Sequence, residues 1–154
     1  MPNDAINPLP NHPVLSAKLA VRGADAAIAF YENVFSAELL MILRDDKERV
    51  IHAELQIGDC HLMLGEEIAE YNNYAPPHFG GTPVHLHLYV KNADATMEAA
   101  KAAGATVIIP VDEQFYGDRT GRFEDPFGHV WILATRVADV SAEELKQRWA
   151  AMSA

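Results

Sequence analysis

Histidine and carboxylate side chains recur at two-residue spacing in two stretches of the chain. His52 and Glu54 form one pair, and His85 and His87 form the other. Residues two apart on a β-strand point to the same face, so each pair would present both side chains together. Two histidines with a carboxylate are a known ligand set for divalent metals, and histidine also exchanges protons near neutral pH. Both kinds of chemistry require a strand at each stretch.

Further polar residues extend this set of candidates. Glu54 and Glu124 are candidate general bases, while Lys18 and Arg119 could hold an anionic group. His61 is expected on the same sheet face as His52, Glu54 and Lys18. A polar pocket that binds an organic ligand, or an acid/base site without metal, is therefore an alternative to a metal site. For each residue a purely structural role also stays open.

Aromatic residues stand in two long connections where no core position is evident. Phe115 and Tyr116 precede Gly117, and residues 65–83 contain further aromatic side chains. Such loops could close over a pocket and stack on a ligand, or they could pack against a partner subunit. His12, by contrast, is interpreted as structural, as are His78 and His129. Cys60 is expected to be a buried, inert thiol on the helix-facing side of its strand.

The elements that must position these residues follow a repeated order. Apolar alternation predicts strands, and apolar residues at helical spacing predict helices. The order is β-α-β-β-β, a connection, and β-α-β-β-β again. The expected ranges are 14–21, 24–35, 38–44, 50–57 and 60–64, then 84–90, 93–103, 106–111, 122–124 and 129–135, with 112–121 as a second long loop. Ser141 and Glu144 form a capping box that opens a terminal helix.

The two halves superimpose at an offset of 69 residues. Val21 falls on Val90, and Ala24-Asp25-Ala26 falls on Ala93-Asp94-Ala95. This predicts an α+β protein in which two βαβββ modules form a curved mixed sheet that cups a ligand site. The expected organisation is an irregular arm (1–13), a first module (14–64), a linker (65–83), a second module (84–137) and a C-terminal helix (138–154).

Composition narrows the classes of partner. The chain has 154 residues, of which 49% are hydrophobic and 22% charged, and its formal net charge is −10. A packed core is thus expected, while nucleic acids and anionic membranes, which attract basic surfaces, are not expected as partners. Cys60 is the one cysteine, and the N-terminus lacks the features of a signal peptide. These observations predict a cytoplasmic location.

Four segments resemble a known family. They are Ala27–Ala37, His52–Gly58, Phe115–Gly121 and Glu124–Trp131. Together they are similar to the vicinal oxygen chelate superfamily of glyoxalases, bleomycin-resistance proteins and extradiol dioxygenases, with the PhnB-like glyoxalase-related proteins most alike. The resemblance covers about residues 14–137. It implies the paired-module fold and a small organic molecule as partner, in an enzyme or a plain binding protein.

The usual metal positions of that superfamily project onto Ser16, Met63, His85 and Ile132. His85 alone among them is a plausible ligand. The resemblance therefore implies a small-molecule-binding protein without the usual four-ligand metal site and with no required cofactor. The alternative is a metal-dependent lyase, isomerase or dioxygenase with a displaced divalent site, built on His85 with His87, His52 or Glu54. An interaction module without a small ligand is a third hypothesis.

A homodimer is also expected. Sheets of this kind expose strand edges that need cover, and members of the superfamily usually pair. The apolar side chains of Leu145 and Trp149 lie at i, i+4 on the C-terminal helix and could supply part of the interface.

Overall fold

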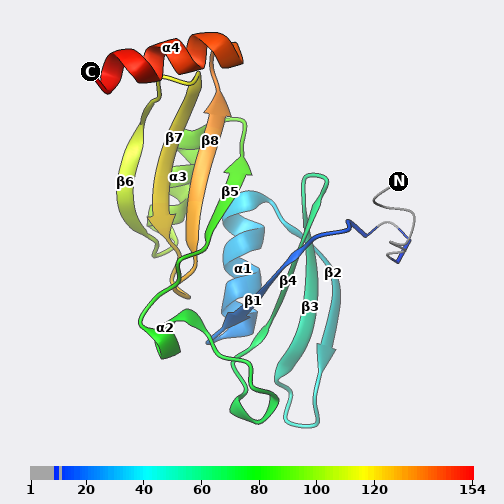
Figure 1. Ribbon diagram of the computed structural model, residues 1–154. Helices are drawn as coiled ribbons and strands as arrows, with labels where there is room; N and C mark the ends of the chain where they lie inside the picture. The colour runs from blue at the N-terminus through cyan, green and yellow to red at the C-terminus, as the bar shows by residue number, and fades with distance from the viewer. Residues whose placement is uncertain (1–8, 11) are drawn as a thin grey trace. The chain divides into compact units, whose positions relative to one another are not determined.

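The structure, a computed structural model, describes residues 9–10 and 12–154. Part of the expected irregular arm, residues 1–8 and 11, lies outside the described residues. The chain divides into two compact units, unit 1 (Met1–Gly81) and unit 2 (Thr82–Ala154). Each unit holds one four-stranded sheet (Figure 1).

Unit 1 contains the first βαβββ module. Its elements are β1 (Ala17–Val21), α1 (Ala24–Phe35), β2 (Glu38–Arg44), β3 (Val50–Ile57) and β4 (Cys60–Glu66), followed by a short 3₁₀ helix, η1 (Ala69–Tyr71), and α2 (Pro76–Phe79). The strand order is β1-β4-β3-β2. β1 and β4 are parallel, whereas β4, β3 and β2 are joined by antiparallel pairing.

Unit 2 repeats this arrangement and adds a helix. Its elements are β5 (His85–Tyr89), α3 (Ala93–Ala102), β6 (Thr106–Glu113), β7 (Asp118–Glu124), β8 (Val130–Arg136) and α4 (Ala142–Met152). The order β5-β8-β7-β6, with β5 parallel to β8, mirrors that of unit 1. The predicted α+β fold of two βαβββ modules is thus confirmed.

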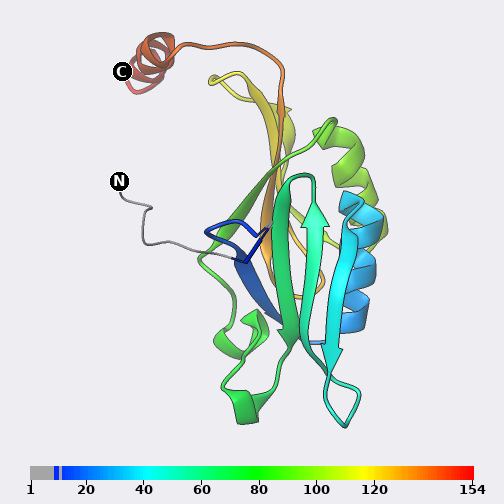
Figure 2. The same cartoon turned by 90° about the vertical axis from the view of Figure 1, so that its right-hand side faces the viewer.

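Each sheet buries one face beneath its helix. In unit 1, α1 lies along one side of the sheet, and the described residues before β1 lie on the other (Figure 2). Alternation in β3 explains why one face of the sheet is buried against α1. Ala53 and Leu55 are fully buried, while His52 and Gln56 point to the other face. In unit 2, α3 covers one face (Figure 1), and Phe123 and Leu133 of the sheet are fully buried. The face of each sheet that no helix covers, here called its open face, is left for polar residues.

Three local predictions are wrong. The first strand begins at Ala17 rather than at 14, and Leu15 is 87% exposed. The expected loop 112–121 is largely strand, because β6 extends to Glu113 and β7 already begins at Asp118. Cys60 is exposed, since it is the first residue after the hairpin turn, where its Sγ contacts Asp59 Oδ1 at 3.6 Å. Loss of hydration around Sγ, followed by the hydrogen bond to the Asp59 carboxylate, raises the pKa of the Cys60 thiol.

The C-terminal helix begins where the capping box predicts. Ser141 is the N-cap of α4, and its Oγ accepts a hydrogen bond from the backbone N–H of Glu144 at 3.1 Å. Within the described ranges, no helix has the length and apolar character needed to cross a membrane.

Candidate functional site

The open face of unit 1 carries a row of polar side chains in register. Glu54 of β3 pairs with Met63 of β4, which in turn pairs with Lys18 of β1, and Gln56 pairs with His61. Directly paired residues on neighbouring strands point to the same face. The register therefore brings Lys18, Glu54 and His61 to one face, where the spacing predicted them. Their roles stay predictions.

Glu54 is the centre of this face. It is only 8% exposed, and both carboxylate oxygens are engaged. His52 Nε2 lies 3.0 Å from Oε1, and His12 Nε2 lies 3.0 Å from Oε2. The hydrogen bonds from His52 and then His12 hold the pKa of the Glu54 carboxyl below its ordinary value, against the opposing effect of burial. The same bond to Glu54, followed by one to the carbonyl of Pro10, raises the pKa of His12.

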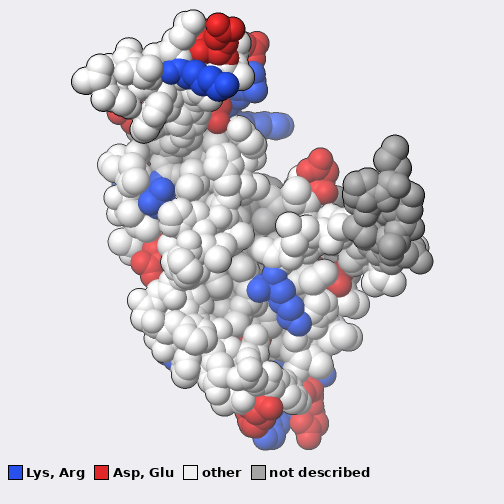
Figure 3. Space-filling model, in the orientation of Figure 1, with Lys and Arg blue, Asp and Glu red and all other residues white. Residues whose placement is uncertain are grey.

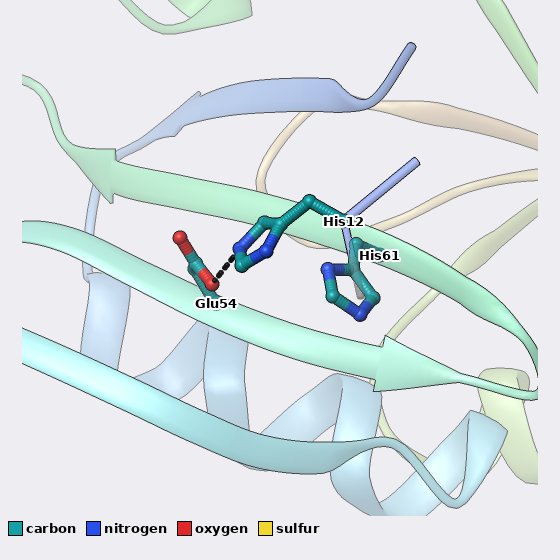
Figure 4. A group of neighbouring side chains, drawn as sticks. All are labelled: His12, Glu54 and His61. Carbon is teal, nitrogen blue, oxygen red and sulfur yellow. Dashed lines mark hydrogen bonds and ion pairs between the residues drawn. The ribbon is translucent and has the colours of Figure 1, made fainter. Parts of the chain in front are cut away.

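His61 completes a cluster with Glu54 and His12. Its ring meets the ring of His12 edge-on, with centroids 4.9 Å apart. Its Nδ1 is buried and has no hydrogen-bond partner among the described residues. One potential ligand atom from each of His12, Glu54 and His61 lies within 4.8 Å of the others. Figure 4 shows the three side chains converging on the open face, His12 from the segment before β1 and the others from β3 and β4.

His12 is the functional candidate that sequence analysis missed. It was interpreted as structural because it stands between Pro10 and Pro13, in a segment without strand or helix periodicity. Periodicity cannot predict where such a segment folds back. The one signal in the sequence was a histidine in a proline-rich arm beside a module with several polar strand positions.

The open face of unit 2 carries the second group of predicted residues. His85, His87 and Tyr89 alternate along β5, and all three are exposed. The rings of His87 and Tyr89 lie 5.0 Å apart. Tyr89 Oη donates to Oδ2 of Asp118, a residue that is 7% exposed, at 3.2 Å. The negative charge of Asp118 and this hydrogen bond raise the pKa of Tyr89.

A cavity of about 490 Å³ lies at the end of this face, beneath α4. The ring of Phe115 lies 5.2 Å from Tyr116 and 5.7 Å from Trp149. Arg148 of α4 donates to the carbonyl of Phe115 at 2.7 Å and so ties the helix to this loop. The lining residues are Tyr89, Phe115, Tyr116, Asp118, Arg136, Val140, Leu145, Lys146 and Trp149. Phe115 and Tyr116, predicted from their loop, therefore meet an aromatic residue from another element.

α4 presents two different faces. Leu145 and Trp149 line the cavity. The helix also carries charged side chains: acidic and basic groups stand together at the top of the view in Figure 3. Arg148 and Glu144 of α4 form an ion pair of 2.6 Å. The apolar positions predicted for a dimer interface thus contribute to a pocket of the same unit.

The remaining predicted residues lie apart from these groups. Arg119 donates to both carboxylate oxygens of Asp94, at 2.7 and 2.9 Å, and this ion pair links β7 to the start of α3. Glu124 is the exposed last residue of β7.

The residues predicted for a displaced metal site are divided between the two units. His85 and His87 belong to unit 2, and His52 and Glu54 to unit 1. The displaced metal site built on His85 stays a prediction.

The family of the chain follows from comparison with known proteins. A model of the Glyoxalase/Bleomycin resistance protein/Dioxygenase superfamily matches residues 10–133, which include the first βαβββ module and the second as far as Leu133 in β8. The chain belongs to this superfamily. It is an α+β member of a superfamily whose proteins bind small molecules or act on them as enzymes.

Individual proteins are also similar to this chain. An uncharacterized protein of Mycobacterium bovis is 39% identical over 144 residues, which cover 92% of this chain and 93% of that protein. Among solved structures, TioX from Micromonospora sp. ML1 is 24% identical with a TM-score of 0.63, covering 80% and 98% of the two chains. A PhnB protein from Bacillus cereus is 19% identical with a TM-score of 0.62, covering 79% and 98%. The last two likenesses show the fold alone.

The positions onto which the resemblance projects the usual metal site of the superfamily stay a prediction. They are Ser16 and Met63 in unit 1, and His85 and Ile132 in unit 2. Met63 and Ile132 lie on the open faces, paired with Lys18 and His87, and offer a thioether and an aliphatic chain. Divalent metals in such sites need imidazole nitrogen and carboxylate oxygen, so the four positions are short of donors.

Proposed function

We propose that this superfamily member binds a flat, largely apolar organic molecule in the cavity of unit 2, without the four-ligand metal site. The observation that carries the proposal is the meeting of Phe115, Tyr116 and Trp149 around that cavity. Its volume of about 490 Å³ falls within the range of small-molecule sites. Aromatic side chains offer flat faces on which a planar ligand stacks.

Exposure of these aromatic groups supports the same proposal. Trp149 is 58% exposed, Tyr89 63% and Tyr116 38%. Large apolar groups that gather in contact with water usually mark a binding surface. Asp118, nearly buried at the same cavity, accepts from Tyr89 and adds a fixed polar group that could orient a ligand.

A planar fluorescent probe, anilinonaphthalene sulfonate, tests the proposal. Trp149 lines the cavity and is 58% exposed, so the bound probe should quench its emission. We expect Tyr116→Ala and Tyr89→Ala to weaken binding roughly 3- to 10-fold, the loss of one stacking contact. Tyr71→Ala is the matched control, because Tyr71 is 62% exposed and lies in unit 1. Equal probe affinity in all four proteins would refute the cavity as the binding site.

The aromatic cavity has a second interpretation, namely an interface between two copies of the chain. We keep the homodimer as a proposal, supported by the exposed side chain of Trp149 and the half-buried side chain of Leu145 at the cavity. Light scattering at micromolar concentration tests it. A dimer that Trp149→Ala converts to monomer would assign these residues to the interface, while a monomeric wild type would refute the homodimer.

Three finer proposals accompany this function. Membership of the PhnB-like branch is supported by the fold shared with the PhnB protein of Bacillus cereus. A cytoplasmic location is supported by the single cysteine. Glu54 and Glu124 stay candidate general bases, and a reaction that Glu54→Gln slows at unchanged ligand affinity would assign the catalytic role to Glu54.

A further inference from the structure

We propose that His12, Glu54 and His61 bind one divalent first-row transition metal ion on the open face of unit 1. This site differs from the four positions of the superfamily. It uses β3, β4 and the segment before β1, and none of its three residues is Ser16, Met63, His85 or Ile132. It is also separate from the aromatic cavity, which belongs to unit 2.

The distances within the cluster suit a shared metal ion. His12 Nε2 and Glu54 Oε2 are 3.0 Å apart. Two ligands at right angles around one ion, each about 2.1 Å from it, are separated by about 3 Å. The third donor lies within 4.8 Å of the others, a little beyond the roughly 4.2 Å that opposite ligands span. A small rotation of the His61 side chain would therefore close the set around an ion.

The second argument is the unpaired nitrogen of His61. Its Nδ1 is buried and lacks a hydrogen-bond partner among the described residues. A buried polar atom without a partner costs about 1–3 kcal/mol, so native proteins usually satisfy it with protein, water or an ion. A metal ion shared with His12 and Glu54 supplies that partner directly.

His52 supports the carboxylate from outside the cluster. Its Nε2 lies 3.0 Å from Glu54 Oε1, the oxygen that does not face His12. Such a contact fixes the plane of a ligating carboxylate and leaves the other oxygen for the ion. Glu54 is therefore held in place before any metal arrives, which lowers the entropy lost on binding.

The donor set also defines the class of ion. Two imidazole nitrogens and one carboxylate oxygen suit Zn²⁺, Co²⁺, Mn²⁺, Fe²⁺ or Ni²⁺ better than Mg²⁺ or Ca²⁺, which prefer all-oxygen sites. Three protein ligands leave further coordination positions for water or an organic ligand.

Cobalt titration of untagged protein tests the proposal, because Co²⁺ bound to nitrogen and oxygen ligands absorbs visible light. Elemental analysis after dialysis against Zn²⁺ gives an independent stoichiometry. All proteins should carry Cys60→Ser, since the exposed thiol adjoins His61 and could bind metal by itself. The variants are His61→Ala, Glu54→Gln and His52→Ala. His78→Ala is the matched control, because His78 stacks on Tyr74 at 4.1 Å, away from the cluster.

We expect one ion per chain. His61→Ala and Glu54→Gln should weaken Co²⁺ binding by more than about 100-fold, and His52→Ala by about 10- to 100-fold. His78→Ala should bind like the parent, and far-UV circular dichroism should show that every variant is folded. Equal affinity of His61→Ala and the parent would overturn the proposal. So would stoichiometric metal that is lost in His85→Ala and retained in His61→Ala, because the ion would then lie at the superfamily position.

Discussion

Glu66 and Thr135 cap α1 and α3, the helices of the two βαβββ modules, from equivalent positions. Glu66 Oε2 accepts a hydrogen bond from the N–H of Ala24 at 2.7 Å, and Thr135 Oγ1 accepts one from Ala93 at 2.8 Å. Glu66 and Thr135 are 69 positions apart, and so are Ala24 and Ala93. In each unit the last strand therefore satisfies a free N–H at the helix start. The repeat conserves the geometry of this bond while the chemical group differs.

Removal of the Glu66 carboxylate should destabilise unit 1. This side chain also accepts from Gly23 at 2.8 Å, so Glu66→Ala leaves two N–H groups at the start of α1 without their acceptor. Loss of a helix cap costs about 1–2 kcal/mol in the free energy of unfolding. Urea unfolding measures it. Glu32→Ala, on the exposed side of α1, should change stability by less than about 0.5 kcal/mol. Equal stability of both variants would contradict the capping role.

The dependence of stability on pH should include a contribution from Glu67. The N–H of Ala75 and the guanidinium of Arg22, at 2.7 and 2.8 Å, hold the pKa of Glu67 below its ordinary value of 4.5. A folded pKa below the unfolded one stabilises the protein above the unfolded value, and this stabilisation is lost as pH falls through the folded pKa. Glu67→Gln should therefore lower the melting temperature at about pH 7 and have less effect at about pH 3. An equal decrease in melting temperature at both pH values would contradict a stabilising role of the ionised Glu67 carboxylate.

Substitution of Gly117 should loosen the cavity of unit 2. Gly117 has φ +94°, and an added Cβ would lie 2.5 Å from the carbonyl oxygen of Ala138. Gly117→Ala should cost about 1–3 kcal/mol and weaken probe binding, because Ala138 leads into α4. Gly80→Ala is the control. Gly80 has φ +80° but open space around it, so strain alone should appear there, with unchanged probe binding. Calorimetry and probe titration together distinguish the two effects.

Asp125 should be essential to the turn before β8. It is 3% exposed, and it accepts hydrogen bonds from the N–H groups of Phe127 and His129 and from Trp131 Nε1, at 2.9, 3.0 and 2.9 Å. Asp125→Ala removes the carboxylate that accepts these three hydrogen bonds, with an expected loss of about 3 kcal/mol or more in the free energy of unfolding. The emission of Trp131 should shift to longer wavelength as water reaches its indole. Asp46→Ala, in an exposed turn, should show neither change.

Periodicity predicted the fold wherever apolar side chains alternate. In β3, Ala53 and Leu55 are buried and His52 faces the other way, as the spacing indicated. β7 was predicted only from 122, because Asp118–Gly121 lacks apolar alternation. This stretch is nevertheless strand, since it pairs with β6 on one side and β8 on the other. The prediction at Leu15 was wrong in the opposite sense. Its residue type suits a strand, but pairing with β4 begins only at Ala17.

The candidate sites were predictable to a smaller extent. Two-residue spacing placed His52 beside Glu54, and the sheet faces brought His61 to the same side. His12 was not predictable, because its position depends on the path of a proline-rich segment and not on a strand or helix. Phe115 and Tyr116 were identified as candidates from their loop. Their approach to Trp149 depends on the path of the segment between β8 and α4, whose backbone bonds to Gly117. Side-chain periodicity does not encode that path.

His12 enters its cluster from residues that the βαβββ module does not need in order to form its sheet. β3 and β4 provide Glu54 and His61 as part of the framework, whereas the third group is contributed by a segment with no strand or helix of its own. The evolutionary history of the fold and that of the cluster can therefore differ. A few substitutions or a length change before β1 could create or abolish the cluster in a relative whose sheet is unaltered. Overall sequence identity is thus a poor guide to whether such a relative retains it.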